Sequence, residues 1–171
     1  MEKITKEEFL KRATAKNIKQ MRGHDAPSYE WDIYFDNKKI CNCWDDSWGG
    51  ELQITNYDNQ SIEDIYNLID KDSLWDKQYN WTTSIDLLME DLLNIGFEKK
   101  DFEKNQKKGL LLGTNKKGEY RIVSWGNVTI PTLLKKYGNK GRDVIQQGIA
   151  KYKDKEDIVN KEYLMSLGFT F

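Results

Sequence analysis

Residues 41–50, "CNCWDDSWGG", hold the densest group of reactive side chains in this 171-residue chain. Ten positions contain two cysteines, two tryptophans, two adjacent aspartates and a pair of glycines. Thiolates and carboxylates bind metal ions or assist catalysis, whereas indole rings contact ligands and partner proteins. The stretch therefore allows three kinds of chemistry: metal binding, catalysis and recognition.

Metal binding requires more soft ligands than the sequence supplies. Cys41, Cys43 and His24 are the candidates, and a cysteine pair with one intervening residue and one distant histidine does not fit a four-ligand zinc site. No stretch follows the calcium-loop pattern of acidic residues. We expect no metal and no cofactor, and we expect the two cysteines to be buried free thiols.

Catalysis requires a nucleophile with a base beside it. The only histidine, His24, precedes Asp25 in the loop-like sequence "RGHDAPS". The glycines of "GLLLGTNKKG" lack the order of a phosphate-binding loop and suit a hairpin instead. The sequence therefore indicates a protein that is not an enzyme.

Recognition is the chemistry that the two tryptophans allow. Trp44 and Trp48 flank "DDS" and precede Gly49 and Gly50, which permit a tight turn. One interpretation is a hairpin end whose indoles pack in the core. The other is an aromatic, acidic rim that receives a basic or planar partner.

Charge is segregated along the chain, although the net charge is −1. Residues 23–98 contain 17 acidic and four basic side chains, a net charge of −13, whereas residues 1–22 carry +4 and residues 99–171 carry +8. The fold either keeps these segments apart, which creates a field of one sign, or interleaves them. In the first case we expect the partner-binding residues on and beside the first hairpin to be Asp32, Asp36, Trp44, Asp45, Asp46 and Trp48.

The lysine-rich segment "KKDFEKNQKK" covers residues 99–108. It is either a solvated helix face or a surface that contacts phosphate groups. In the second case the contacts are Lys99, Lys100, Lys104, Lys107 and Lys108.

Hydrophobic periodicity predicts the N-terminal elements that position these side chains. Residues 4–15 have helical spacing, with Thr5 and Glu8 as a capping box, and "NIKQMRG" at 17–23 begins a first strand. Apolar residues alternate from 29 to 35 and turn residues follow at 36–39, which predicts a β-hairpin over residues 29–45. A further strand is expected within 51–57.

Helical spacing then returns at residues 61–69 and most strongly at 82–97, with Thr83 as the N-cap and Gly96 as the C-terminal stop. A second hairpin is predicted over 110–125. A helix that stops at Gly138 follows it, then a later helix, and then a last short helix with Asn160 as its N-cap. We therefore expect a single α+β domain, residues 1–171, in which an antiparallel sheet built from two hairpin regions packs against helices.

The N-terminal sequence "MEKITKEEFLKR" lacks the apolar centre of a signal peptide. No run of about 18 apolar residues occurs. We expect a cytoplasmic protein in a reducing compartment, without membrane contact.

The stretch "EWDIYFDNKKICNCWDDSWGG" resembles a group of small uncharacterised proteins encoded by phages, prophages and conjugative elements. Those proteins have a strand, a short turn, a second strand and an acidic turn that ends on two glycines. The later "KKGLLLGTNKKGEYRIVSWG" and "VNKEYLMSLGF" are also similar to their second half. The resemblance implies an origin in a mobile element and an accessory or counter-defence role, and it transfers no catalytic residue.

These observations predict a non-catalytic binding protein of a phage or mobile element. We expect it to inhibit a host defence complex, CRISPR-type or another nucleic-acid-handling effector, by presenting an acidic surface to a cleft that normally holds phosphates. Two alternatives stay open. One is a protein that sequesters a nucleotide signal in an aromatic pocket, and the other is an accessory protein that binds nucleic acid directly.

Overall fold

The computed structural model describes residues 3–23, 26–48, 51–57, 62–114, 116 and 118–171. The chain divides into two compact units, Met1–Glu98 and Lys99–Phe171, here called the N-terminal and C-terminal units. Each unit contains its own cluster of buried hydrophobic side chains, whereas the sequence predicted a single domain over residues 1–171. No residue from 98 to 108 is buried, and neither cluster includes a residue of this stretch.

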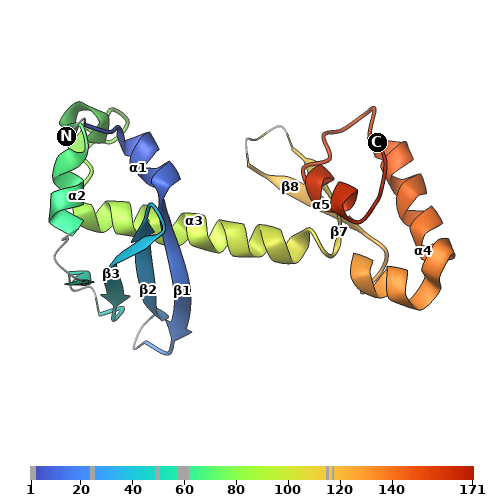
Figure 1. Ribbon diagram of the computed structural model, residues 1–171, viewed down its shortest axis with the longest axis horizontal. Coiled ribbons are helices and arrows are strands. Elements are labelled where there is room, and N and C mark those ends of the chain that lie inside the picture. Colours follow the sequence, from blue (N-terminus) through green and yellow to red (C-terminus); the bar gives the residue numbers. More distant parts are fainter. Residues whose placement is uncertain (1–2, 24–25, 49–50, 58–61, 115, 117) are drawn as a thin grey trace. The chain divides into compact units, whose positions relative to one another are not determined.

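The N-terminal unit combines a four-stranded antiparallel sheet with helices, which confirms the predicted α+β class (Figure 1). The sheet order is β1-β2-β3-β4, so consecutive strands are neighbours. The elements are α1 (Lys6–Arg12), β1 (Ala13–Met21), β2 (Ser28–Phe35), β3 (Lys38–Asp45), β4 (Gln53–Asn56), α2 (Ile62–Leu68), the 3₁₀ helix η1 (Lys71–Leu74), β5 (Trp75–Asp76), β6 (Trp81–Thr82) and α3 (Ile85–Asn105).

One face of the four-stranded sheet is buried against the helices. Trp31, Ile33 and Phe35 alternate along β2 and pack with buried residues of α1, α2 and α3. The intervening residues Glu30 and Asp32 project from the opposite face, as the period of two requires. The predicted hairpin over residues 29–45 is confirmed, and Asp36 and Asn37 form its turn with positive φ angles of 47° and 66°.

α1 has the predicted capping box, in which Thr5 and Glu8 exchange hydrogen bonds between side chain and backbone. It ends at Arg12, earlier than expected, because Ala13 and Ala15 already pair with β2 and are buried in the core. The first strand therefore begins four residues before the predicted segment.

α3 is longer than predicted, because Gly96 does not stop it. A Cβ atom at Gly96 would lie 2.7 Å from Cδ1 of Ile18. The glycine therefore allows close packing of the helix against β1 and does not form a C-cap. At the other end Ser84, and not Thr83, accepts the capping hydrogen bond, from the N–H of Leu87.

The C-terminal unit is built on a second hairpin. Its elements are β7 (Gly109–Gly113), β8 (Tyr120–Ser124), α4 (Ile130–Tyr152) and α5 (Lys161–Ser166). Gly138 interrupts α4 with φ 53° and ψ −125°, as the sequence predicted, so α4 consists of two helical segments with a bend between them (Figure 1). Neither α3 nor α4, nor another helix in the described ranges, has the length and hydrophobicity needed to cross a membrane.

Asn160 joins the hairpin of this unit to its C-terminal part. It makes no side-chain cap to α5. Its buried amide instead accepts a hydrogen bond from the N–H of Leu111 at 3.0 Å and donates to the carbonyls of Gly109, at 2.9 Å, and Gln106, at 3.2 Å. One side chain thus satisfies three backbone groups beside β7.

Candidate binding site

The acids of the first hairpin lie at different places along it. Asp36 is in the turn, whereas Asp45 is at the opposite end, paired with Tyr29. Eight strand residues at about 3.3 Å each separate these ends by about 25 Å. Asp36, Asp32 and Asp45 therefore do not gather in one patch on this hairpin.

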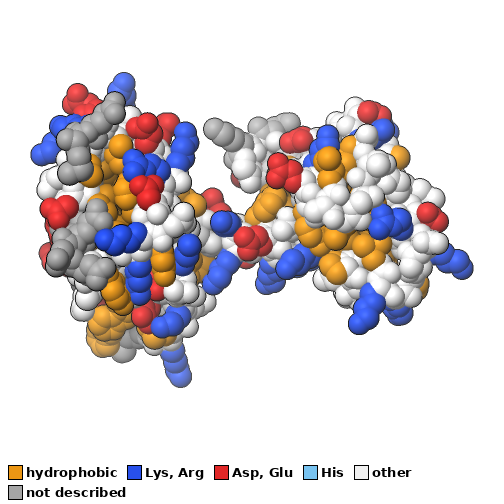
Figure 2. Space-filling view, in the orientation of Figure 1, with side chains coloured by type: hydrophobic (Ala, Val, Ile, Leu, Met, Phe, Trp, Pro, Cys, Tyr) orange, Lys and Arg blue, Asp and Glu red, His pale blue; other side chains and the backbone are white. Residues whose placement is uncertain are grey.

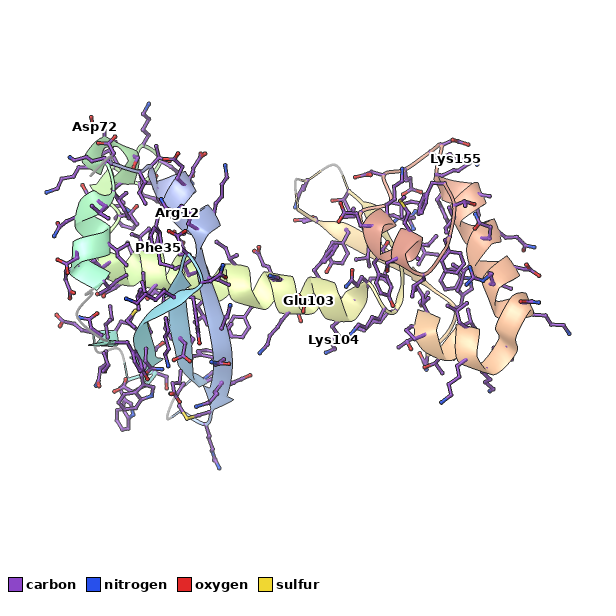
Figure 3. The ribbon with its side chains drawn as sticks, viewed as in Figure 1. Arg12, Phe35, Asp72, Glu103, Lys104 and Lys155 are labelled. Carbon is purple, nitrogen blue, oxygen red and sulfur yellow. The ribbon has the colours of Figure 1, made fainter. Side chains whose placement is uncertain are left out.

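Asp36 has a cationic partner. Its carboxylate accepts a hydrogen bond from Nε of Arg12 at 3.0 Å, and the guanidinium of Arg12 also lies 4.5 Å from the centre of the Phe35 ring (Figure 3). The hydrogen bond from Arg12 keeps the pKa of Asp36 below its ordinary value. Asp36 is exposed, but its charge is already paired.

Asp32, another predicted partner-binding residue, is buried. Its carboxylate accepts hydrogen bonds from Asn17 at 2.7 Å and Asn42 at 3.0 Å, and Nζ of Lys39 lies at 2.9 Å. Burial alone would raise the pKa of Asp32, but these hydrogen bonds and the charge of Lys39 together lower it. Asp32 is therefore an ionised side chain that links Asn17, Lys39 and Asn42 on the outer face of the sheet.

The acidic segment interleaves in part with the basic N-terminus. Nζ of Lys19 lies 3.1 Å from Glu30, and Nζ of Lys6 lies 3.1 Å from Asp91. Figure 2 shows Lys and Arg side chains beside acidic ones on the visible face of the N-terminal unit. The charged segments thus interleave in part, whereas the N-terminal unit as a whole keeps an acidic excess.

The end of β3 is a tight acidic loop. Oδ1 of Asp45 accepts the N–H of Ser47 and Oδ1 of Asp46 accepts the N–H of Trp48, both at 2.9 Å. Ser47 has a positive φ of 63°. The two aspartates thus build the loop and also give it charge. The glycine pair at 49–50 lies outside the described residues.

Both tryptophans of this stretch reach the surface. Trp44 is 38% exposed on the outer face of the sheet, and its indole N–H donates to Oγ of Ser28 at 3.3 Å. Trp48 is 67% exposed. The interpretation of both indoles as core packing is therefore wrong. The interpretation as a binding rim stays a prediction, for which Trp48 on this loop is the more exposed of the two aromatic side chains.

A cavity of about 610 Å³ lies between this end of the hairpin and α3; we call it the α3 cavity. Tyr29 and Trp31 line it from β2, and Asp45 and Ser47 line it from the end of β3. The residues from α3 follow helical spacing, which puts them on one face of the helix: Glu90, Leu93, Asn94 and Phe97.

The α3 cavity brings two carboxylates together from distant parts of the sequence. Desolvation raises the pKa of Glu90, and the negative charges of Asp45, Asp86 and Asp91 raise it further. Tyr29, the cross-strand partner of Asp45, and Phe97 of α3 also line the cavity, and their rings meet edge to face with centroids 5.3 Å apart. The sequence indicated Asp45 as a binding residue but gave no signal for Glu90, which lies on a helix 45 positions later.

A second group of exposed aromatic residues was missed at sequence level. Trp75, Tyr79 and Trp81 project from the short β5–β6 hairpin, and the rings of Tyr79 and Trp81 stack with centroids 5.3 Å apart. Oδ1 of Asp76 accepts the N–H groups of Gln78 and Tyr79 and so shapes the turn. The available signal was three large aromatic residues within seven positions.

The lysines predicted to contact phosphate lie at the end of α3 and just after it. Lys99, Lys100, Lys104 and Lys107 are exposed, whereas Nζ of Lys108 donates to Oδ1 of Asn105 at 2.8 Å. Acidic residues alternate with them in the sequence, and Glu103 is the neighbour of Lys104 (Figure 3). The segment is a mixed-charge helix surface with a basic excess.

Cys41 and Cys43 are free and buried on the core side of β3. The hydrogen bond with Cys41 is the largest cause that raises the pKa of the Cys43 thiol, and burial raises this pKa further. Such thiols are poor nucleophiles and poor metal ligands. His24 lies outside the described residues, and within the described part of the chain no three His, Cys, Asp or Glu side chains form a metal-binding group.

Comparison with known proteins gives no relative. No protein-family model, no curated protein and no solved structure matches the chain. The candidate site is therefore defined by the geometry of this chain alone. It consists of the acidic loop with Trp48 at the end of β3 and of the α3 cavity beside it.

Proposed function

We propose that this protein is a non-catalytic binding protein of a phage or mobile element that acts in the bacterial cytoplasm. Its target is a host defence complex that handles nucleic acid, such as a CRISPR-type effector. The single observation that carries this proposal is the division of charge between the two units. The N-terminal unit contains 11 basic and 20 acidic residues, a net charge of −9, whereas the C-terminal unit contains 16 and eight, a net charge of +8.

An acidic unit is attracted to the positively charged clefts in which such effectors hold phosphates. Attraction alone gives little specificity, so a binding surface also needs hydrophobic anchors. The exposed Trp48 beside Asp45 and Asp46 combines both requirements. The proposed contact is therefore this loop, and not the whole first hairpin.

A second function, direct contact with nucleic acid, is favoured by the bend of α4. Lys135, Lys136, Tyr137 and Lys140 are all exposed around Gly138. Lysines and an aromatic ring at a helical bend suit contacts to phosphates and bases. Under this alternative the C-terminal unit binds the nucleic acid of the same complex.

A nucleotide-sequestering role receives less support. The α3 cavity has aromatic walls, but Asp45 and Glu90 line it. Carboxylates repel the phosphates of a nucleotide, and no lysine or arginine is among the described residues that line this cavity.

The test uses the full-length chain and a panel of purified RNA-guided effectors. We expect it to bind at least one of them and to slow its DNA cleavage, and we expect the chain to restore phage plating on cells that carry that effector. The variant Asp45→Asn/Asp46→Asn/Trp48→Ala keeps an acceptor oxygen at both loop positions but removes the charges and the ring. It should bind at least about tenfold more weakly.

The matched control is Asp101→Asn/Glu103→Gln, which removes two exposed charges from the last part of α3, the part that follows Glu98 and so belongs to the C-terminal unit. It should bind like the parent chain. Equal loss in both variants would mean that net charge alone drives association. Binding that nuclease treatment abolishes would favour the second function, and a chain that neither binds nor inhibits any effector would contradict the proposal.

A further inference from the structure

Two residues of the α3 cavity wall carry buried polar groups that no described residue satisfies. Trp31 lines the cavity and is 1% exposed, and its indole N–H has no partner among the described residues. The hydroxyl of Ser47, another lining residue, is likewise buried without a described partner. Leaving such a group unpaired typically costs a protein stability. Both atoms are closed off from solvent, so a ligand that carries an acceptor gains this hydrogen bond where the cavity wall moves aside to admit it.

The same cavity concentrates negative charge. Asp45 and Glu90 both line it, and the raised pKa of Glu90 reflects desolvation together with like charges around it. A cation in the cavity would relieve this repulsion. The Trp31 N–H and the two acids together suit a ligand that carries a positive group and, a short distance away, a hydrogen-bond acceptor.

The walls distinguish between kinds of cation. A divalent metal ion prefers a shell of oxygen ligands, but Tyr29 and Phe97 contribute aromatic surface, and no metal-binding acidic group exists among the described residues. A guanidinium group is planar and weakly hydrated, pairs with carboxylates through several N–H donors and also stacks on aromatic rings. The volume of about 610 Å³ lies within the usual range for ligand sites.

We propose that the α3 cavity binds a guanidinium group of the kind carried by an arginine side chain, with Asp45 and Glu90 as its anionic contacts and the Trp31 N–H as donor to an acceptor on the same ligand. If the guanidinium belongs to a partner protein, the site deepens the proposed function, and this part of the inference rests on that function. The chemistry of the cavity is otherwise independent of it.

The experiment follows the indole N–H signals of the full-length, ¹⁵N-labelled chain by NMR. The chain has six tryptophans, and the Trp31→Phe variant assigns the signal of Trp31. The probe is N-acetyl-L-arginine amide, which carries both the guanidinium and neutral carbonyl acceptors. The control probe is N-acetyl-L-citrulline amide, in which an uncharged urea of nearly the same shape replaces the guanidinium.

We expect the Trp31 signal to shift saturably with the arginine probe at a Kd of about 1 mM or lower. The citrulline probe should bind at least about tenfold more weakly, because the charge contact is missing. Asp45→Asn and Glu90→Gln should each weaken binding of the arginine probe several-fold. Asp36→Asn, at the other end of the hairpin, should leave the affinity unchanged.

A Trp31 signal that the arginine probe does not shift would overturn the proposal, as would equal binding of both probes or full affinity in the Asp45→Asn and Glu90→Gln variants. A heptapeptide with one central arginine then distinguishes the sources. Tighter binding than the single blocked residue supports a partner protein, and weaker binding supports a free guanidinium compound. If the probe binds while no effector is inhibited, the proposed function fails and the cavity site remains.

Discussion

The two units hold a polar side chain among their strands by different means. In the N-terminal unit this side chain is Asp32, an ionised carboxylate that needs Lys39 and two asparagine amides. In the C-terminal unit it is Asn160, a neutral amide whose three hydrogen bonds go to backbone groups. The first arrangement depends on charge and pH, and the second depends only on geometry.

The two units also differ in net charge and in their ion pairs. The N-terminal unit carries a net charge of −9 and pairs three of its acids with Lys6, Arg12 and Lys19 from its own first 22 residues. The C-terminal unit carries +8, and one of its arginines, Arg121, pairs with Glu156 at 2.6 Å. Electrostatic substitutions should therefore act mainly on the first unit, whereas loss of neutral hydrogen bonds should act mainly on the second.

The largest effect is expected for Asn160→Ala. The substitution leaves the N–H of Leu111 and the carbonyl of Gly109 without their partner in a buried setting, at about 1–3 kcal/mol for each group. We expect about 3 kcal/mol of destabilisation, measured by urea unfolding. Amide hydrogen exchange, measured by mass spectrometry, should become faster in peptides from residues 109–171.

The control for this substitution is Asn139→Ala, because Asn139 is an exposed asparagine of the same unit. It should change stability by less than about 0.5 kcal/mol. If Asn160→Ala were equally mild, or if exchange increased first in the N-terminal unit, the contrast between the two polar side chains would be lost.

A smaller, pH-dependent effect is expected for Asp32→Asn. The pKa of Asp32 is lowered in the folded chain from an ordinary value of 3.8, so its ionised form stabilises the fold above that pH. We expect a loss of about 1.5 kcal/mol near neutral pH, since Lys39 loses a charged partner. As the pH falls below 3.8 through the folded pKa, the parent protein loses this contribution and the difference should disappear.

Asp36→Asn provides the matched comparison. The pKa of Asp36 is also lowered, but its pair with Arg12 is exposed and asparagine suits a turn residue with positive φ. Its cost should be clearly smaller than that of Asp32→Asn, because solvent screens an exposed pair. Equal losses in the two variants would show that burial does not distinguish these aspartates.

The sequence predicted the elements better than the roles of individual residues. Alternation along β2 and the turn at 36–37 are local patterns, and both appear in the structure. Gly96 and Asn160 were assigned local capping roles, but their contacts are to Ile18 and to the backbone beside β7. Such long-range contacts depend on packing, which no local pattern encodes.

The candidate site shows the same limit. The loop with Asp45, Asp46 and Trp48 stood out because its residues are adjacent in the sequence. Asp32 looked equivalent to them, since a strand pattern tells which face a residue is on but not what covers that face. Glu90 joins Asp45 only because α3 packs across the end of the hairpin.

The smallest effect, and one of opposite sign, is expected for Glu90→Gln in the N-terminal unit. The pKa of Glu90 is raised above its ordinary value of 4.5, so the folded chain binds this proton more tightly than the unfolded chain does. Stability therefore falls as the pH rises above 4.5 through the folded pKa, and glutamine removes this loss. We expect Tm near neutral pH to rise by at most about 2–4 °C, because Glu90 is exposed and solvent screens its neighbours. Below pH 4.5 the parent and the variant should have the same Tm. A higher Tm of the variant at that pH would come from packing. A lower Tm of the variant near neutral pH would mean that Asp45, Asp86 and Asp91 do not repel this carboxylate.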